Sequence, residues 1–122
     1  MHALIIENQF LLATLIEVEL RELGYASFEV VDTEADAIRS AAANCPDLIT
    51  ADHRLTEGTG VEAIRMICSE RPIPVVFITA YPQEVREKLP DAVLLGKPFA
   101  PRALREAVGQ AIVVSRRSSE AA

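Results

Sequence analysis

The chain has 122 residues, of which 50% are hydrophobic and 25% are charged, a composition typical of one globular domain rather than of a disordered segment. Its formal net charge of −6 disfavours direct contact with nucleic acid or with anionic membranes, since both are negatively charged. No apolar run approaches the roughly 18 residues of a membrane-spanning helix. An acid at position 7 comes too early for a signal peptide, so we expect a cytoplasmic protein.

Short apolar runs alternate along the chain with segments of helical periodicity. In chain order, the pattern predicts a strand over 3–7, a helix over 9–23, a strand over 27–31, a helix between Thr33 and Pro46, a strand over 47–51, a helix from 61 up to Pro72, a strand over 74–80, a helix over 82–89, a strand over 92–95 and a last helix from Pro101.

Local signals mark several of these boundaries. Gly24 follows the first helix as a candidate C-terminal cap, and Thr33 offers its hydroxyl as an N-cap for the second. After Val114 the chain becomes polar and rich in small residues. We therefore expect a domain over residues 1–114 and a flexible tail over 115–122.

Two cysteines, Cys45 and Cys68, stand 23 positions apart. Neither belongs to a C-x-x-C pair, so the spacing favours neither a metal site nor a redox motif. We expect both to be small buried side chains in a reducing compartment.

Five strands alternating with five helices favour a doubly wound α/β sheet, in which ligands bind beyond the carboxyl ends of the strands. Polar residues collect at those ends: Glu7, Asn8, Asp52, Thr79 and Lys97. Any one of them has an ordinary explanation as a helix cap or a solvated charge. Together they suit the transfer of a phosphoryl group to a carboxylate.

That chemistry assigns a role to each residue type. Asp52 would attack phosphorus and form an aspartyl phosphate. Since two negative groups repel, a divalent cation is needed between them, and Mg²⁺ prefers carboxylate and amide oxygens such as those of Glu7 and Asn8. The Lys97 ammonium and the Thr79 hydroxyl would hold the remaining phosphoryl oxygens.

Four segments carry a resemblance to a known family: "IIEN" after the first strand, "LITAD" at the third, "VVFITA" at the fourth and "LLGKPF" at the fifth. In this order and spacing, residues 3 to about 114 resemble the receiver domain of two-component response regulators. The resemblance implies a flavodoxin-like parallel sheet of order 2-1-3-4-5 with helices on both faces.

The resemblance also implies a set of site residues. Asp52 would be the phosphoacceptor, supplied by a sensor histidine kinase or a phosphotransfer protein. Mg²⁺ would be surrounded by Glu7, Asn8, Asp52 and the backbone carbonyl of Arg54. Thr79 and Lys97 would contact the phosphoryl group, and the bond before Pro98 would be cis, as only X-Pro bonds readily are.

Three positions depart from the family pattern. Asn8 stands where the family has a second acid that ligates the metal, so we expect weaker Mg²⁺ binding. Leu94 stands where the family tends to have an aromatic switch residue, while an aromatic appears at Tyr81. Only 18 positions separate Thr79 from Lys97, which predicts a fourth helix about one turn shorter than usual.

The segment "FITAYP" resembles a subgroup of receivers whose fourth strand reads F-x-T-G/A-x-Y. Members of that subgroup occur as stand-alone domains and in regulators of the alphaproteobacterial general stress response. Here Tyr81 follows Ala80 directly, one position earlier than in the subgroup pattern.

The prediction is a single-domain response regulator that signals through a downstream protein partner, with no direct nucleic acid or membrane contact. It would be no enzyme beyond its own phosphorylation and dephosphorylation. The alternative is a degenerate receiver that binds partners without phosphorylation, which Asn8 and Leu94 favour. A phosphoester hydrolase is disfavoured because Arg54 stands where such enzymes place a second aspartate. Arg54 either steers anionic donors or is simply solvated, and no role is predicted for His53.

Overall fold

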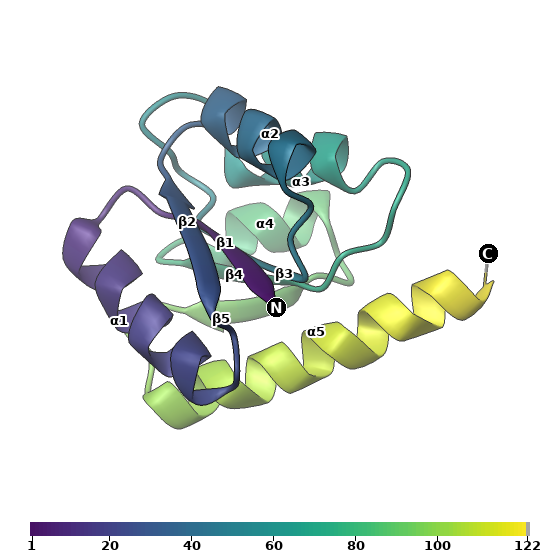
Figure 1. Cartoon of the computed structure of the whole chain (residues 1–122). Helices are drawn as coiled ribbons and strands as arrows, with labels where there is room; N and C mark the ends of the chain where they lie inside the picture. The colour runs from purple at the N-terminus through teal and green to yellow at the C-terminus, as the bar shows by residue number, and fades with distance from the viewer. Residues whose placement is uncertain (122) are drawn as a thin grey trace.

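Five strands and five helices alternate in the computed structural model, which describes residues 1–121 and the side chains of residues 1–118 (Figure 1). The elements are β1 His2–Ile6, α1 Phe10–Glu22, β2 Ser27–Val31, α2 Glu34–Ala43, β3 Leu48–Ala51, α3 Gly60–Ile67, β4 Val75–Thr79, α4 Pro82–Lys88, β5 Val93–Gly96 and α5 Pro101–Ala121. Within the described residues, no helix is long and apolar enough to cross a membrane.

The strands form one parallel sheet of order β2-β1-β3-β4-β5, which confirms the predicted doubly wound arrangement. α1 and α5 cover one face and α2, α3 and α4 cover the other (Figure 1). Alternate residues of β1 serve the two faces: Ile5 packs with α1 and α5, whereas Leu4 and Ile6 pack with α2 and α3. Burial on both faces explains why this strand is an unbroken apolar run.

Caps set the ends of several helices. Gly24 has a φ of +101°, a conformation that suits glycine, and the amides of Gly24 and Tyr25 close the last turn of α1. The Thr33 hydroxyl accepts a 3.1 Å hydrogen bond from the Asp36 amide at the start of α2, as predicted. Thr59 caps α3 in the same way, at 3.2 Å from the Glu62 amide, so this helix begins one residue earlier than predicted.

The last helix differs from its prediction. The structure describes residues 115–121 as a continuation of α5, where the sequence predicts a flexible tail over 115–122; residue 122 lies outside the described residues. The segment contains no proline or glycine to end the helix, and Ser115 and Ser118 line a pocket against the body of the domain. The domain division at residue 114 remains a prediction.

The cysteine prediction was wrong in part. Cys45 lies in the loop after α2 and is exposed, and Cys68, the C-terminal cap of α3, is half-buried. The Arg71 guanidinium donates to the Cys45 sulfur at 3.0 Å. Burial and then the nearby Cys45 raise the pKa of the Cys68 thiol, with a hydrogen bond from the Ile73 backbone acting against them.

Candidate functional site

Four strands deliver the candidate site residues to one edge of the sheet. Glu7 and Asp52 directly follow β1 and β3, Thr79 ends β4, and Lys97 directly follows β5. Their backbones continue the strand ladder by one step, since the Asp52 amide donates to the Ile6 carbonyl at 2.9 Å and the Lys97 amide donates to the Thr79 carbonyl at 3.0 Å. The sheet therefore holds these four residues in register.

The Lys97 ammonium lies between two buried carboxylates. Its Nζ is 2.8 Å from Asp52 Oδ2, 3.0 Å from Glu7 Oε1 and 3.2 Å from Glu7 Oε2. The exposed fractions of these side chains are only 14% for Lys97, 9% for Asp52 and 1% for Glu7. Ionic contacts out of water are much stronger than at the surface. One positive charge thus lies between two negative ones and neutralises only part of their charge.

The two carboxylates are held from the backbone as well. The His53 amide donates to Asp52 Oδ1 at 2.7 Å, and the Gln9 amide donates to Glu7 Oε2 at 3.1 Å. Glu7 Oε1, although close to Lys97, has no partner with hydrogen-bonding geometry and is fully buried. Of the two oxygens of Glu7, Oε1 is thus the one available to a further ligand.

Burial raises the pKa of Glu7 above its usual value of 4.5. The hydrogen bond from Lys97 and that from the Gln9 amide act in the opposite direction, and the charge of Asp52 adds to the rise. Burial thus disfavours the ionised form of Glu7 more than Lys97 and the Gln9 amide favour it.

The donor set suits a hard cation. Glu7 and Asp52 offer carboxylate oxygens, the ligand type that Mg²⁺ prefers, and the buried Glu7 Oε1 lacks a hydrogen-bond partner. Within residues 1–121, however, no group of three or more His, Cys, Asp or Glu side chains is placed to hold a metal. The protein side chains that would hold Mg²⁺ are thus limited to these two acids, supplemented by Asn8.

Asn8 does not join the cluster as the structure stands. Its side chain is exposed and, among the described residues, makes no hydrogen bond. The Leu94 side chain is half-buried and packs with the α2–α4 side of the core rather than with the site. The Lys97–Pro98 bond is cis, as the resemblance implies.

Thr79 is fully buried at the end of β4. Its hydroxyl accepts a 3.0 Å hydrogen bond from the Tyr81 amide, in the turn that leads to α4. Any new contact of this hydroxyl would therefore be coupled to the loop that carries Tyr81.

The side chains of His53 and Arg54, which follow Asp52, lie in different surroundings. The His53 side chain is buried, and its contribution to the site is the backbone amide on Asp52 Oδ1. The Arg54 side chain is exposed and points away from the carboxylates, toward Tyr81 and Glu84. The predicted role of its backbone carbonyl toward Mg²⁺ stays a prediction.

Gly60 is a functional position that the sequence reasoning missed. A Cβ atom there would lie 1.9 Å from the backbone oxygen of Asp52, which no other residue type could avoid. The Gly60 amide also donates to the His53 carbonyl at 2.8 Å. The start of α3 is thus pressed against the backbone of the phosphoacceptor candidate, and the glycine in "EGTG" was the available signal.

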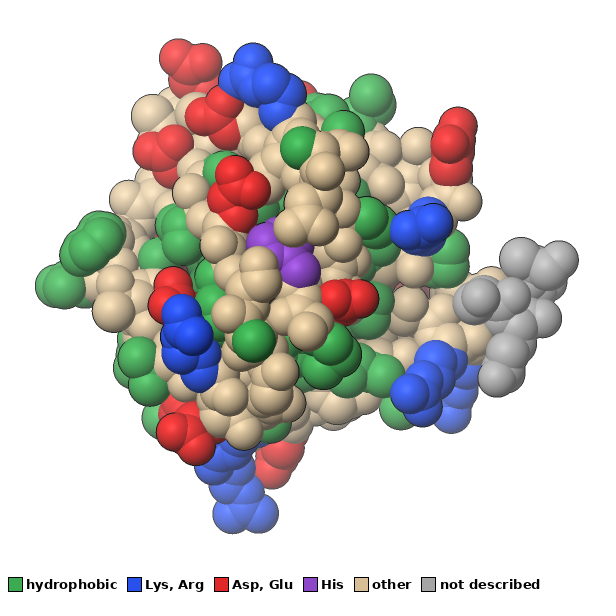
Figure 2. Space-filling view, in the orientation of Figure 1, with side chains coloured by type: hydrophobic (Ala, Val, Ile, Leu, Met, Phe, Trp, Pro, Cys, Tyr) green, Lys and Arg blue, Asp and Glu red, His purple; other side chains and the backbone are tan. Residues whose placement is uncertain are grey.

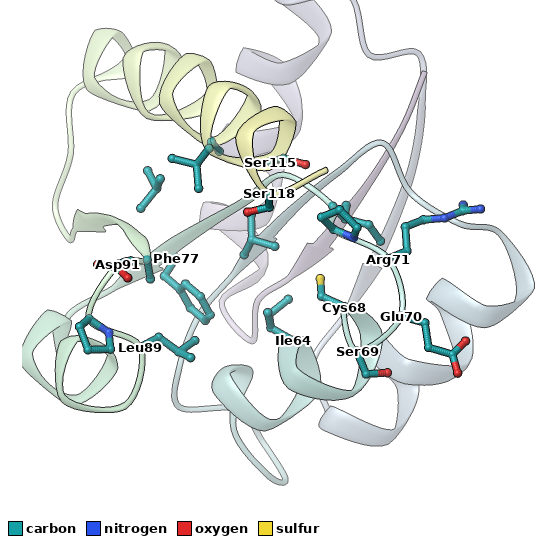
Figure 3. A pocket seen from close by; sticks show the side chains of 18 residues that line it. Ile64, Cys68, Ser69, Glu70, Arg71, Phe77, Leu89, Asp91, Ser115 and Ser118 are labelled. Carbon is teal, nitrogen blue, oxygen red and sulfur yellow. The ribbon is translucent and has the colours of Figure 1, made fainter. Parts of the chain in front are cut away.

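Two pockets lie at opposite edges of the sheet. One, of about 800 Å³, adjoins the site between the start of α1 and the Lys97–Phe99 segment. The other, of about 570 Å³, is formed by the end of α3, the start of β4 and the last turns of α5, with Cys68, Arg71, Ser115 and Ser118 on its wall (Figure 3). Only the first is placed to affect chemistry at Asp52.

The sequence of the chain matches the model of a known family. The model of the response regulator receiver domain family matches residues 3–109. The chain belongs to this family. Its membership confirms the resemblance and places the chain among signalling domains of two-component systems.

Several proteins similar to this receiver are of the PhyR type. The chain is 34% identical over 113 residues to the phyllosphere-induced regulator PhyR of Methylorubrum extorquens. This alignment covers 89% of the chain and 42% of that protein. The receiver domain of Erythrobacter litoralis PhyR has a TM-score of 0.83 at 31% identity, over 92% of this chain and 89% of the other. The anti-anti-sigma factor PhyR of Bartonella quintana has a TM-score of 0.81 at 30% identity, over 98% and 50%. The chain thus spans about half the length of the curated relatives it matches.

Proposed function

We propose that this receiver accepts a phosphoryl group on Asp52 from the phosphohistidine of a sensor kinase or phosphotransfer protein, and passes the signal on by protein contact in the cytoplasm. The observation that carries the proposal is the Lys97 ammonium held between the buried carboxylates of Asp52 and Glu7. A buried acid pair with a shared cation is costly to maintain, and transfer of a phosphoryl group to Asp52 would give the pair a function.

Each contact has a part in the transfer. A carboxylate oxygen of Asp52 attacks phosphorus as the bond from phosphorus to the donor nitrogen breaks, and that nitrogen keeps the electron pair. The His53 amide orients Asp52 through Oδ1. Lys97, already 2.8 Å from Oδ2, is placed to follow the charge onto the phosphoryl oxygens. Mg²⁺, held by Glu7, Asp52 and Asn8, would supply the charge neutralisation that one ammonium cannot.

The surface beside the site suits a protein donor. Phe10 and Leu11 at the start of α1 are 80% and 81% exposed, and Leu15 is 44% exposed. Hydrophobic side chains project at the left edge in Figure 2, where Figure 1 places the start of α1. These residues line the 800 Å³ pocket together with Lys97 and Phe99. Exposed apolar side chains at the mouth of a polar site favour docking of a partner protein over access by small donors alone.

The relatives support a protein as the downstream partner. The Bartonella quintana relative bears the description of an anti-anti-sigma factor, a role exerted by protein contact. The "FITAYP" segment and the PhyR-type relatives together support a role in a general stress response. The net charge of −6 agrees with an output through protein rather than nucleic acid.

The degenerate receiver is the second candidate, and one observation favours it: the exposed Asn8 adds no charge to the two acids. One experiment separates the two functions. The protein is incubated with Mg²⁺ and either acetyl phosphate or a phosphorylated histidine phosphotransfer protein, and its intact mass is measured. We expect a gain of one phosphoryl group that is lost in Asp52→Asn and retained in Asp91→Asn, an exposed acid far from the site.

A separate variant tests the docking surface at the start of α1. Leu11→Ser is expected to slow transfer from the protein donor while leaving the reaction with acetyl phosphate unchanged, because Leu11 lines the mouth but contacts none of the reacting groups. If neither donor produces an adduct, the chain is a degenerate receiver. An adduct that persists in Asp52→Asn would assign the phosphoryl group to another residue.

A further inference from the structure

Arg54 holds two partners that belong to the opposite side of the site mouth. Its Nε and Nη2 donate to the two carboxylate oxygens of Glu84 at 3.0 and 3.1 Å. The guanidinium carbon lies 3.5 Å from the centroid of the Tyr81 ring, close stacking for a cation on an aromatic face. Together these contacts tie the loop after β3 to the start of α4.

Arg54 and Tyr81 stand at equivalent positions relative to two site residues. Arg54 stands two positions after Asp52, and Tyr81 stands two positions after Thr79. The Tyr81 amide is also the resting donor to the Thr79 hydroxyl. Any event at Asp52 that draws in either Arg54 or Thr79 therefore pulls on the same short loop.

The contacts are of a kind that a stronger anion can displace. The Arg54 and Glu84 side chains are 56% and 40% exposed, and ion pairs between exposed side chains are weakened by solvent screening. The hydrogen bond to Glu84 is the main cause that raises the pKa of Arg54, and the charges of Tyr81 and Asp52 add to it. A phosphoryl group on Asp52 would carry up to two negative charges where the carboxylate carries one, and it would add three acceptor oxygens that could compete with Glu84 for Arg54.

α4 is held loosely enough to respond. It has only seven residues, and Val85 is its one buried side chain among them. The pair formed by Glu84 in its first turn is therefore a substantial part of what attaches this helix to the loop after β3. Loss of such a tie favours local opening of the helix start.

We propose that Arg54 is a phosphoryl-sensing residue: on phosphorylation of Asp52 its guanidinium leaves Glu84 and Tyr81 for the phosphoryl oxygens, and the start of α4 is released. This inference rests on the proposed phosphorylation of Asp52. It assigns to Arg54 and Tyr81 a coupling role in a chain that has Leu94, rather than an aromatic residue, in β5. The partner that reads the state would then contact α4.

The test compares the protein with Glu84→Gln, Arg54→Gln, the double variant, and Glu87→Gln as a matched control. Glu87 lies on the same helix, is exposed and has no ion pair within the described residues. Three quantities are measured with Mg²⁺ and acetyl phosphate: the rate of mass gain, amide hydrogen exchange of residues 82–88, and the NMR shift of the Arg54 Nε–Hε group.

In the unmodified chain, phosphorylation should shift the Arg54 Nε–Hε resonance and speed exchange in α4. Glu84→Gln frees Arg54 in advance, so phosphorylation should become roughly two- to fivefold faster, the equilibrium factor of an exposed ion pair, and α4 should exchange quickly before phosphorylation. Arg54→Gln should abolish this gain, so that the double variant matches Arg54→Gln. Glu87→Gln should behave as the unmodified chain.

The outcomes separate this inference from the proposed function. An adduct that forms without a shift at Arg54, and with equal α4 exchange in Glu84→Gln and Glu87→Gln, overturns the sensing role alone. No adduct in any variant overturns both.

Discussion

The Lys97 ammonium forms ion pairs with two acids, whereas the ammonium of an exposed lysine would be hydrated. Its ammonium is within 3.0 Å of both Asp52 and Glu7, whose side chains are almost completely buried. A second cation must share these oxygens with Lys97, so metal binding and the lysine position are coupled. In the resting site, Lys97 itself provides the positive charge between the two acids.

Lys97→Met removes that charge while keeping the length of the side chain. Two buried carboxylates are then left without a counter-charge, and we expect the free energy of unfolding to fall by about 3 kcal/mol without divalent cations. Mg²⁺ should restore part of the loss. Urea denaturation with and without Mg²⁺ measures both effects, and equal stability of the two proteins in a chelating buffer would contradict the role given to Lys97.

The deficit of Lys97→Met should depend on pH. The lysine lowers the pKa of Glu7, which burial raises above 4.5, so its removal lets that pKa rise further. A carboxyl group with a raised pKa in the folded state stabilises the fold at low pH and loses that contribution as the pH rises through the folded value. The variant should therefore come closest to the unmodified chain in mildly acidic urea titrations and fall behind as the pH increases. A deficit that grows on acidification would contradict this account.

Asn8→Asp tests the missing charge next to Glu7. Ligand charge tunes the affinity of oxygen-based cation sites, so we expect Mg²⁺ to bind roughly an order of magnitude more tightly. Titration calorimetry measures the affinity, and Asn44→Asp, in the loop after α2, serves as the control for added charge. Unchanged binding would mean that the exposed Asn8 side chain does not reach the metal.

At the scale of elements, strands and helix starts were the parts that the sequence predicted well. β1 and β4 are apolar runs because both of their faces are covered, and Thr33 caps α2 because its hydroxyl reaches the Asp36 amide. These are local properties. The strand order and the edge at which Glu7, Asp52 and Lys97 meet followed from the rules of parallel α/β sheets and from the resemblance.

What could not be predicted depends on contacts between distant segments. The tie from Arg54 to Glu84 spans 30 positions, and nothing in either segment alone indicates it. The burial of Cys45 was predicted wrongly because a thiol has no pattern of its own and the loop after α2 turns outward. The close approach of Gly60 to Asp52 depends on how α3 docks, which only the assembled sheet determines.

Gly60→Ala tests this approach of α3 to the loop after β3. The added methyl group would meet the Asp52 carbonyl, so the loop must shift, and we expect a loss of about 1–3 kcal/mol in unfolding free energy together with slower phosphorylation. Gly109→Ala is the matched control, since a Cβ atom there meets nothing within 4 Å and alanine favours the interior of α5. Similar stability and phosphorylation rates for both variants would show that the loop can yield at no cost.

On the scale of the whole molecule, the two ends of the strands carry different features. The acids, Lys97 and the exposed start of α1 lie at one edge, and the pocket closed by the last turns of α5 lies at the other (Figure 3). The chemistry proposed for the first edge uses no residue beyond Phe99, so the extension of α5 should be separable from it.

A chain ending at Val114 puts this to the test and examines the predicted domain boundary. We expect it to fold, to unfold in one cooperative transition and to take up phosphate from acetyl phosphate at an unchanged rate. A modest decrease in Tm is expected, because Ser115 and Ser118 no longer cover the pocket. Circular dichroism during heating, with intact mass after phosphorylation, provides the measurement. A chain that fails to fold would place the boundary after residue 114.

The contact between Lys97 and Glu7 joins residues 90 positions apart. During synthesis, Glu7 and Asp52 leave the ribosome long before the lysine that neutralises them, and β5 must emerge and dock before Lys97 can reach them. A partly made chain thus carries Asp52 but not the ammonium beside it. Under the proposed function, a nascent chain therefore cannot accept a phosphoryl group with the help of Lys97 until β5 has docked.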